Sequence, residues 1–329
     1  MRTHAQCLRC SRSGMSRVEA VVTICLIGFL LSMLAPAIHG PRRGARRMEC
    51  QNSLKNLALA TSNYATANAG RIPLLEDGQF GWPVSLLPHL DSAALHRTLM
   101  ADPLAVEKDW QKTKSPLLIR VLTCPVDLSN AGWHVGLSYV ANAGWGRFAA
   151  DSRTEAISEV RPHSADIDWD GDGSVTADER RLTRSTGLFW RGHADGFQLT
   201  LDDINAGDGQ SSTMLFTENT NARNWLSRET FDIGCVAELE RVTFEPRQAD
   251  RFSLHVRSAN LGPFAIQLMP RVLPGRSPVP SSKHTGIFNV AFADGRVEQV
   301  NVNINPRIYL AQMTWDGIRN GEDPKQQLK

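Results

Sequence analysis

The sequence predicts an α+β protein in which a long N-terminal helix packs on a β-rich, mainly antiparallel body. Three observations carry this prediction. An apolar run is followed directly by a segment with helical spacing, and apolar residues alternate around an Asp-Gly pair near the C-terminus. The composition is that of a globular protein, with 42% hydrophobic and 21% charged residues in 329. A long helix beside an antiparallel sheet gives the α+β arrangement.

The first expected element is a transmembrane helix over residues 15–38. It contains 19 uncharged residues from Ala20 to Ile38. As a helix these residues span about 28 Å, close to the hydrocarbon core of a bilayer. A basic leader, residues 1–14, precedes the helix, and four arginines lie between Arg42 and Arg47 after it. Counting Arg17, the arginines on the two sides are equal in number, so the positive-inside rule does not settle the orientation.

Three interpretations of this segment stay open. It is a secretory signal peptide cut after Ala37 in an A-x-A pattern, a plain signal anchor, or a type IV prepilin signal. The stretch GMSRVE resembles the prepilin signal, which places a glycine at the cut and a glutamate at the fifth mature position. Gly14 and Glu19 fit this spacing, whereas Met15 and Arg17 depart from the usual G-F-T-L-I-E. The resemblance implies cleavage after Gly14 by a prepilin peptidase.

Residues 39–70 predict an amphipathic helix that continues the apolar one as its soluble half. Gly70 suits a C-terminal cap. We expect the combined helix to be interrupted near Pro36, Gly40 and Pro41, because proline removes a backbone hydrogen bond and clashes with the preceding turn. The residues at three-to-four spacing, which predict the buried face, are Leu54, Leu57, Ala58, Thr61, Tyr64, Ala65 and Asn68.

Six ordered blocks are similar to a large family of planctomycete proteins. That family joins a prepilin-type N-terminus to a domain of unknown function with a C-terminal H-X9-DG motif. The resemblance implies a pilin-like layout and a type II secretion pseudopilin-like character, and it carries no established chemistry. The blocks are Arg46–Lys55, Trp82–Leu90, Cys124–Asp127, Ser138–Gly144, Asp208–Thr213 with Glu218, and His284 with Asp294 and Gly295.

The last block predicts a β-hairpin over residues 286–304. Apolar side chains alternate from Phe288 to Phe292, and Asp294-Gly295 is a strong signal for a two-residue type I′ turn. A straight strand that rises about 3.3 Å per residue would separate His284 from Asp294 by roughly 30 Å. These two residues then share neither a metal nor a proton. We therefore predict a structural motif, and a ligand role for His284 is the alternative.

An acidic insertion at about 160–185 matches the calcium-loop pattern D-x-D-x-D-G-x5-E in full. It resembles an EF-hand loop or the loop of a dockerin-like module. Three short carboxylates converge on a hard cation, Gly173 permits the sharp turn, and the final glutamate gives two oxygens. We predict a structural Ca²⁺ site, and a solvated acidic turn is the alternative. The predicted ligands are Asp168, Asp170, Asp172, Ser174, Thr176 and Glu179.

Three of the six cysteines, Cys50, Cys124 and Cys235, belong to the body of the chain. If the body is exported, one disulfide is expected, because oxidising compartments favour it. We favour the pair Cys50 and Cys124, which leaves one thiol over. Three free, buried cysteines are the alternative.

Charge and motif content exclude several function classes. The net charge is +2, and it becomes −1 if the leader with its three arginines is removed, so nucleic-acid binding is not expected. The sequence has no H-E-x-x-H spacing, G-x-S-x-G elbow, P-loop or Rossmann glycine pattern, so we expect no enzyme.

We therefore expect a membrane-anchored pilin- or pseudopilin-like protein of a type II secretion or type IV pilus-like assembly. It would cross the inner (cytoplasmic) membrane once, with the globular part, residues 71–329, in the periplasm or outside the cell. Its partners would be the membrane, a prepilin peptidase and like or unlike pilin-type chains, with Glu19 meeting a neighbour's new amino terminus. The alternative is a membrane-tethered extracytoplasmic module that binds a sugar, a solute or a surface partner. An aromatic cleft for that ligand would involve Trp82, Trp133, Trp145 or Trp190.

Overall fold

A computed structural model describes residues 16–102, 117–131, 135–146, 167–169, 172–192, 196–222, 224–238, 241–247, 251–257 and 280–317. Gly14 and Met15, at the expected processing site, lie outside the described residues, as does the rest of the leader. The chain divides into two compact units, residues 1–46 and residues 47–329. The second unit is an α+β body with a mixed five-stranded sheet.

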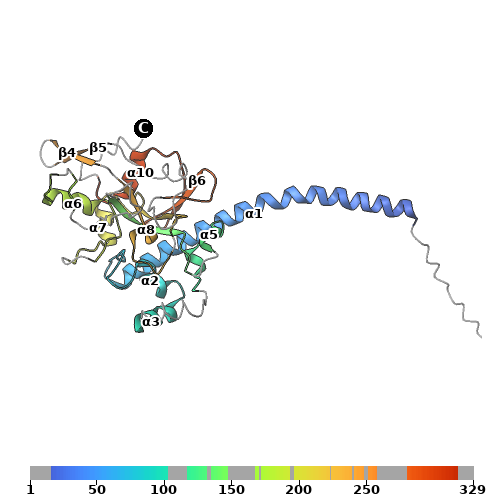
Figure 1. Cartoon of the computed structure of the whole chain (residues 1–329), viewed down its shortest axis with the longest axis horizontal. Helices are drawn as coiled ribbons and strands as arrows, with labels where there is room; N and C mark the ends of the chain where they lie inside the picture. The colour runs from blue at the N-terminus through green and yellow to red at the C-terminus, as the bar shows by residue number, and fades with distance from the viewer. Residues whose placement is uncertain are drawn as a thin grey trace, which may run out of the picture. The chain divides into compact units, whose positions relative to one another are not determined.

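The helix α1 (Arg17–Ala67) is the longest element of the described chain, with 51 residues (Figure 1). The interruption expected near Pro36 and Pro41 is absent from its backbone, so that prediction was wrong. Each proline removes one hydrogen bond at a cost of about 3 kcal/mol, which a helix of this length absorbs without breaking.

The start of α1 is capped by its own side chains. Ser16 Oγ accepts the Glu19 N–H at 3.2 Å, and Glu19 Oε2 accepts the Ser16 N–H at 2.9 Å. This reciprocal pair is a capping box, a role of Glu19 that the prepilin interpretation did not include. The large apolar side chains that follow, from Val18 to Leu31, are exposed. Among the described helices, none combines the length and the apolar character needed to cross a membrane.

The later part of α1 packs into the second unit by the face that its spacing predicts. Leu54, Leu57, Ala58, Thr61 and Ala65 are all buried, whereas Tyr64 is half-buried and Asn68 is exposed. The helix closes with a hydrogen bond of 2.8 Å from Gly70 N–H to the Ala65 carbonyl. Gly70 has a φ of +82°, the left-handed conformation that glycine adopts at a helix end.

The central sheet has the order β3-β1-β2-β6-β7. Strands β1 and β3 are parallel, and the other neighbours are antiparallel, so the expected mainly antiparallel pairing is confirmed. Tyr139 at the start of β1 pairs with Glu218 at the end of β2, and Thr217 pairs with Val290 of β6. The strands are β1 (Tyr139–Gly146), β2 (Met214–Glu218), β3 (Gly234–Glu238), β6 (Ile287–Phe292) and β7 (Val297–Asn301).

Short helices and a second sheet complete the described body, and the sequence patterns did not resolve them. The second sheet pairs β4 (Arg241–Arg247) with β5 (Arg251–Arg257). The α-helices are α2 (Trp82–Leu86), α3 (Ala93–Ala101), α5 (Leu128–Ala131), α6 (Ala177–Ser185), α7 (Leu201–Ala206), α8 (Thr230–Ile233) and α10 (Pro306–Met313). Two 3₁₀ turns are η1 (Leu87–His89) and η2 (Arg120–Leu122).

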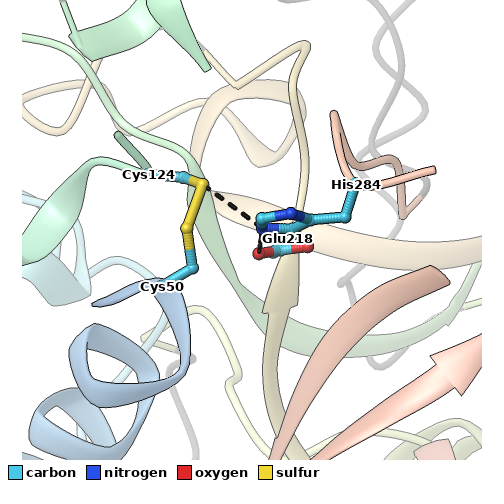
Figure 2. Close-up of side chains that lie close together, drawn as sticks. All are labelled: Cys50, Cys124, Glu218 and His284. Carbon is cyan, nitrogen blue, oxygen red and sulfur yellow. Dashed lines mark hydrogen bonds and ion pairs between the residues drawn. A yellow bond between two sulfur atoms is a disulfide. The ribbon is translucent and has the colours of Figure 1, made fainter. Parts of the chain in front are cut away.

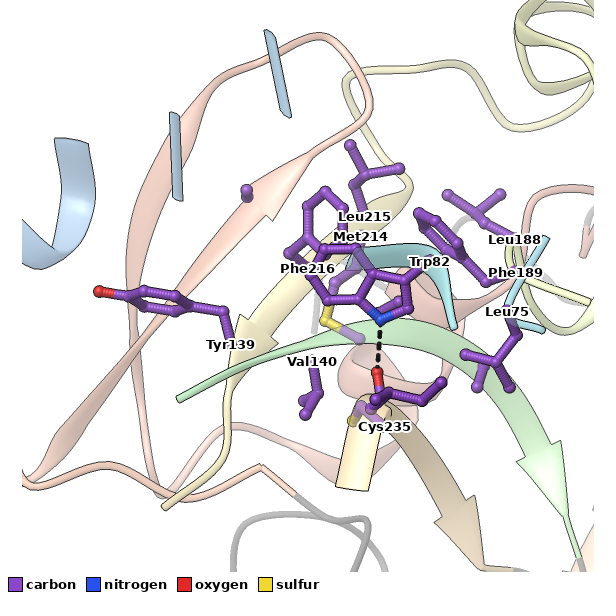
Figure 3. Close-up of a cluster of buried hydrophobic side chains, with 14 of the residues drawn as sticks. Leu75, Trp82, Tyr139, Val140, Leu188, Phe189, Met214, Leu215, Phe216 and Cys235 are labelled. Carbon is purple, nitrogen blue, oxygen red and sulfur yellow. Dashed lines mark hydrogen bonds between the residues drawn. The ribbon is translucent and has the colours of Figure 1, made fainter. Parts of the chain in front are cut away.

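An aromatic cluster forms the centre of the core (Figure 3). The ring of Trp82 lies 4.8 Å from that of Phe216, and Phe189 lies 5.3 Å from Phe216, as measured between centroids. The indole N–H of Trp82 donates to the Ile233 carbonyl at 2.8 Å, so its polar edge is satisfied inside the protein. The cluster joins α2, the end of α8 and strand β2 into one packed unit.

The C-terminal hairpin forms between β6 and β7 as predicted, but its turn is of another kind. Phe292 N–H donates to the Arg296 carbonyl at 2.8 Å, and Gly295 N–H donates to the Phe292 carbonyl at 2.9 Å. The loop therefore encloses three residues. Only Gly295 in it has a positive φ, +85°, whereas a type I′ turn needs two such residues. Asp294 instead accepts the Arg296 N–H at 2.9 Å.

Candidate functional site

Four side chains from distant parts of the sequence meet inside the second unit (Figure 2). Cys50 comes from α1, Cys124 from the segment after η2, Glu218 from the end of β2 and His284 from the loop before β6. All four are buried, and their ligand-type atoms lie within 4.8 Å of one another. Each belongs to a different sequence block that resembles the planctomycete family. We call these four residues the Cys-His-Glu cluster.

The two cysteines of the cluster form a disulfide, the pair favoured from the sequence. The Cα atoms are 5.3 Å apart, and the bond closes a sequence separation of 74 residues. It fastens α1 to the body of the second unit. Cys50 is 0% exposed and Cys124 is 4% exposed, so both sulfurs are shielded from bulk solvent.

His284 lies between the disulfide and the carboxylate. Its Nε2 atom is 3.7 Å from Cys124 Sγ and 3.6 Å from Glu218 Oε1. Figure 2 shows the imidazole pointing toward both groups. The backbone N–H of His284 donates to Ser282 Oγ at 3.0 Å, which fixes the loop that carries the ring. A ligand role for His284 was only the alternative prediction from the sequence, and its two neighbours were not predicted.

The Glu218 carboxylate accepts two hydrogen bonds from Asn289, one on each oxygen. Asn289 donates its backbone N–H to Oε2 at 3.1 Å and its side-chain amide to Oε1 at 2.8 Å. Burial raises the pKa of Glu218, and hydrogen bonds from Ser282 and Asn289 together with nearby His284 offset part of that increase. Burial and then the Glu218 charge raise the pKa of neighbouring Tyr139 well above its ordinary value.

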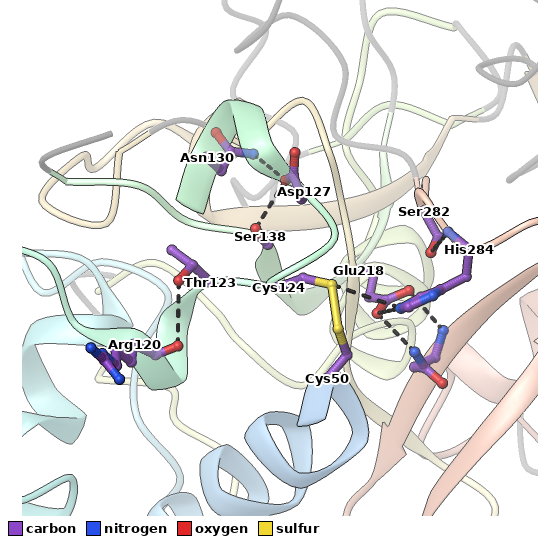
Figure 4. The surroundings of a disulfide bond; sticks show 11 residues. Cys50, Arg120, Thr123, Cys124, Asp127, Asn130, Ser138, Glu218, Ser282 and His284 are labelled. Atoms are coloured by element: carbon purple, nitrogen blue, oxygen red, sulfur yellow. Dashed lines mark hydrogen bonds and ion pairs between the residues drawn. A yellow bond between two sulfur atoms is a disulfide. The ribbon is translucent and has the colours of Figure 1, made fainter. Parts of the chain in front are cut away.

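A second buried carboxylate, Asp127, orders the turn that presents Cys124 (Figure 4). The Asp127 N–H donates to the Cys124 carbonyl at 3.0 Å. Its Oδ2 accepts the Asn130 amide at 2.7 Å and the Ser138 hydroxyl at 2.9 Å. This network explains why an aspartate follows the Cys-Pro pair, because its hydrogen bonds fix the backbone that aims the sulfur.

The Asp294-Gly295 end of the C-terminal motif does not join the cluster. Asp294 N–H donates to the Gln210 carbonyl at 3.2 Å, and Ala293 N–H donates to the Thr213 carbonyl at 3.0 Å. The turn therefore docks on the loop that begins at Asp208. Strand β6 separates it from His284, so the two ends of the motif have separate structural surroundings.

The structure describes five of the six residues that the sequence predicts as calcium ligands. Asp168 accepts the N–H groups of Asp172 at 3.2 Å and of Gly173 at 2.9 Å, so the loop folds back on its first carboxylate. Gly173 has a φ of +91°, as the sharp turn at the sixth position requires. Asp170 lies outside the described residues. Ser174 donates its N–H and its hydroxyl to Asp172 Oδ1.

Glu179 and Thr176 form a capping box at the start of α6, which the sequence analysis did not predict. Glu179 Oε2 accepts the Thr176 N–H at 2.8 Å, and Glu179 N–H donates to Thr176 Oγ1 at 3.2 Å. Glu179 Oε1 accepts the Trp169 N–H at 2.7 Å. Glu179 Oε2 also accepts the Thr176 hydroxyl at 3.0 Å. These hydrogen bonds order the loop and the start of α6 around the Glu179 carboxylate.

The described tryptophans among those considered for an aromatic cleft pack in the core. Trp82, Trp145 and Trp190 are 0%, 2% and 3% exposed, and Trp133 lies outside the described residues. The remaining body cysteine is also buried. Burial raises the pKa of the Cys235 thiol from 9.0 to about 12, which leaves it protonated and unreactive at neutral pH.

Sequence reasoning missed the Cys-His-Glu cluster as a unit, although it singled out every member. The available signal was that Cys50, Cys124, Glu218 and His284 each stand in a different one of the six blocks. A family model described as a protein of unknown function (DUF1559), named SBP_bac_10, matches residues 40–307. No curated protein and no solved structure matches the chain.

Proposed function

The chain belongs to the DUF1559 family of proteins of unknown function, and from this premise we propose that it is a membrane-anchored, pilin- or pseudopilin-like assembly protein without enzymatic activity. Residues 15–38 would anchor it in the inner membrane. The globular part would face the periplasm or the exterior, where the disulfide is stable. A prepilin peptidase would cleave after Gly14, and the H-X9-DG motif would serve the fold.

The observation that carries this proposal is the contrast between the two parts of α1. Between Val18 and Leu31 the apolar side chains are exposed, with Ile24 at 68% and Phe29 at 58%. Exposed apolar side chains in such number favour an apolar surrounding, either lipid or other helices. Beyond Arg47 the same helix buries one face in the body, and Cys50 fastens it there. An apolar helical segment that continues into a helix packed on a globular body is the layout that the resemblance to pilins implies.

The position of Glu19 also supports assembly. In the single chain its carboxylate binds the Ser16 N–H at the helix start. Each carboxylate oxygen keeps a further lone pair, so the group can also accept a hydrogen bond from an amine. A neighbouring chain cut after Gly14 would present such an amine. That contact would pair two charges which are costly in lipid when alone.

Crosslinking in native membranes tests the assembly. A photo-reactive residue at Ile24 or Phe29 is expected to link the chain to a second copy or to another pilin-like chain. The same residue at Leu128, which is apolar and 77% exposed in the second unit, is the matched control. Adducts to lipid alone from both α1 positions would contradict an assembly role and favour a tethered monomer.

We further propose that the acidic loop holds one structural Ca²⁺ ion through Asp168, Asp170, Asp172, Ser174, Thr176 and Glu179. Extracellular calcium modules bind with a Kd of about 10⁻⁴–10⁻³ M, which suits an exported protein. The expected gain in the free energy of unfolding is about 2.7 kcal/mol at a Ca²⁺ concentration of 100 times the Kd.

Calcium titration by calorimetry, with thermal unfolding in parallel, checks this prediction. Asp168→Ala is expected to abolish both the heat of binding and the Ca²⁺-dependent rise in Tm. Asp178→Asn is the control, because Asp178 is exposed and lies beside Glu179 but outside the ligand pattern. Equal Ca²⁺ binding by wild type and Asp168→Ala would refute the site.

The alternative function is a membrane-tethered binding module for a sugar, a solute or a surface partner. The family name SBP_bac_10 favours a binding role. The burial of Trp82, Trp145 and Trp190 removes these three side chains from an aromatic cleft. In the crosslinking experiment this alternative corresponds to the lipid-only outcome.

A further inference from the structure

We propose that the Cys-His-Glu cluster binds one Zn²⁺ ion when its disulfide is reduced. The ligands would be the thiolates of Cys50 and Cys124, Nε2 of His284 and one carboxylate oxygen of Glu218. The inference concerns the second unit alone and stands independently of the pilin-like role. It makes the metal and the disulfide two mutually exclusive states of the same four residues.

Two of the six separations between ligand atoms match the edges of a tetrahedral zinc site, and all of them are within 4.8 Å. Zinc binds sulfur at about 2.3 Å and histidine nitrogen or carboxylate oxygen at about 2.0–2.2 Å, which gives tetrahedron edges of roughly 3.3–3.8 Å. The distances from His284 Nε2 to Cys124 Sγ, 3.7 Å, and to Glu218 Oε1, 3.6 Å, fall within that range. The edge between the two sulfurs must lengthen, since they are bonded to each other.

The surroundings of the cluster are those that a metal site requires. The Asn289 amide and N–H orient the Glu218 carboxylate, and Asp127 orders the turn at Cys124. Hydrogen bonds of this kind hold ligands in place, and their loss typically weakens metal binding by about 10–100-fold. All four ligands are buried, so water would not compete strongly with them for the Zn²⁺ ion. Two sulfurs with a nitrogen and an oxygen favour Zn²⁺ over Ca²⁺ or Mg²⁺, which prefer oxygen alone.

Reduction is the step that opens the site. A phosphine reductant breaks the S–S bond, takes an oxygen atom from water to become a phosphine oxide, and leaves two protonated thiols. Each thiol then releases its proton as it binds the metal. A reducing compartment would favour the metal state, and an oxidising compartment would favour the disulfide state.

Cobalt titration of the full-length chain in detergent tests the proposal, in a background where Cys7, Cys10 and Cys25 are replaced by serine. After phosphine reduction, we expect one equivalent of Co²⁺ to give thiolate charge-transfer and tetrahedral d–d absorption, which Zn²⁺ then abolishes. The oxidised chain should give neither. His284→Gln and Glu218→Gln should each weaken binding by about tenfold or more. His96→Gln, on α3 outside the cluster, should leave it unchanged.

Three results would overturn the proposal. The first is the absence of thiolate–cobalt absorption in the reduced, folded chain. The second is absorption that survives unchanged in His284→Gln, which would place the metal elsewhere. The third is a reduced chain that loses its near-UV circular dichroism and does not regain it on addition of Zn²⁺.

Discussion

Replacing both Cys50 and Cys124 by alanine should lower the free energy of unfolding of the second unit by about 4 kcal/mol. The disulfide closes a separation of 74 residues, and removing such a crosslink restores the loop-closure entropy of the unfolded chain. The loss is a large part of the total for a domain whose stability is about 5–15 kcal/mol. Denaturant unfolding followed by tryptophan fluorescence measures it.

The control for this prediction is Cys25→Ala. Cys25 is an exposed, unpaired cysteine of α1, so its replacement should change the free energy of unfolding by less than about 0.5 kcal/mol. A double alanine variant that matched wild type would show that the disulfide does not hold α1 against the body.

Glu218→Leu should lower the free energy of unfolding by about 3 kcal/mol or more. The substitution leaves the buried N–H and amide groups of Asn289 without their acceptor, and each lost partner costs about 1–3 kcal/mol. It also removes the carboxylate beside His284. Breaking a buried pair from one side typically costs about 3–5 kcal/mol.

The matched substitution is Glu298→Leu on β7. Glu298 is exposed and belongs to the same sheet, so this change tests the general effect of placing leucine on a strand. We expect a change within about 0.5 kcal/mol. Similar destabilisation by the two variants would mean that the Glu218 hydrogen bonds contribute nothing specific.

Local patterns predicted the elements whose structure depends on nearby residues. The spacing from Leu54 to Ala65 gave the buried face of α1, because helical periodicity alone decides which side meets the body. Alternating apolar residues around Asp294-Gly295 predicted the hairpin, because strand periodicity is also a local property of the sequence. The predicted turn type was wrong because it depends on the backbone φ angle of Asp294. The hydrogen bond from Asp294 N–H to the Gln210 carbonyl helps to fix that angle.

The Cys-His-Glu cluster could not be predicted as a site, because its members come from four elements that only the tertiary fold brings together. The geometry of a straight strand separates His284 from Asp294, but it gives no information about residues on other strands. The antiparallel pairing of β2 with β6 places Glu218 beside Asn289 and the loop of His284. The sequence favoured the disulfide between Cys50 and Cys124, but residue spacing alone did not decide between this disulfide and free thiols.

The mature N-terminus tests the central claim most directly. The full chain, expressed with an active prepilin peptidase and recovered from membranes, should begin at Met15 when its N-terminal peptide is identified by mass spectrometry. Replacement of Gly14 by a bulky residue should leave the leader attached. A chain that begins at Met1 or at Ile38 would contradict the pilin-like account.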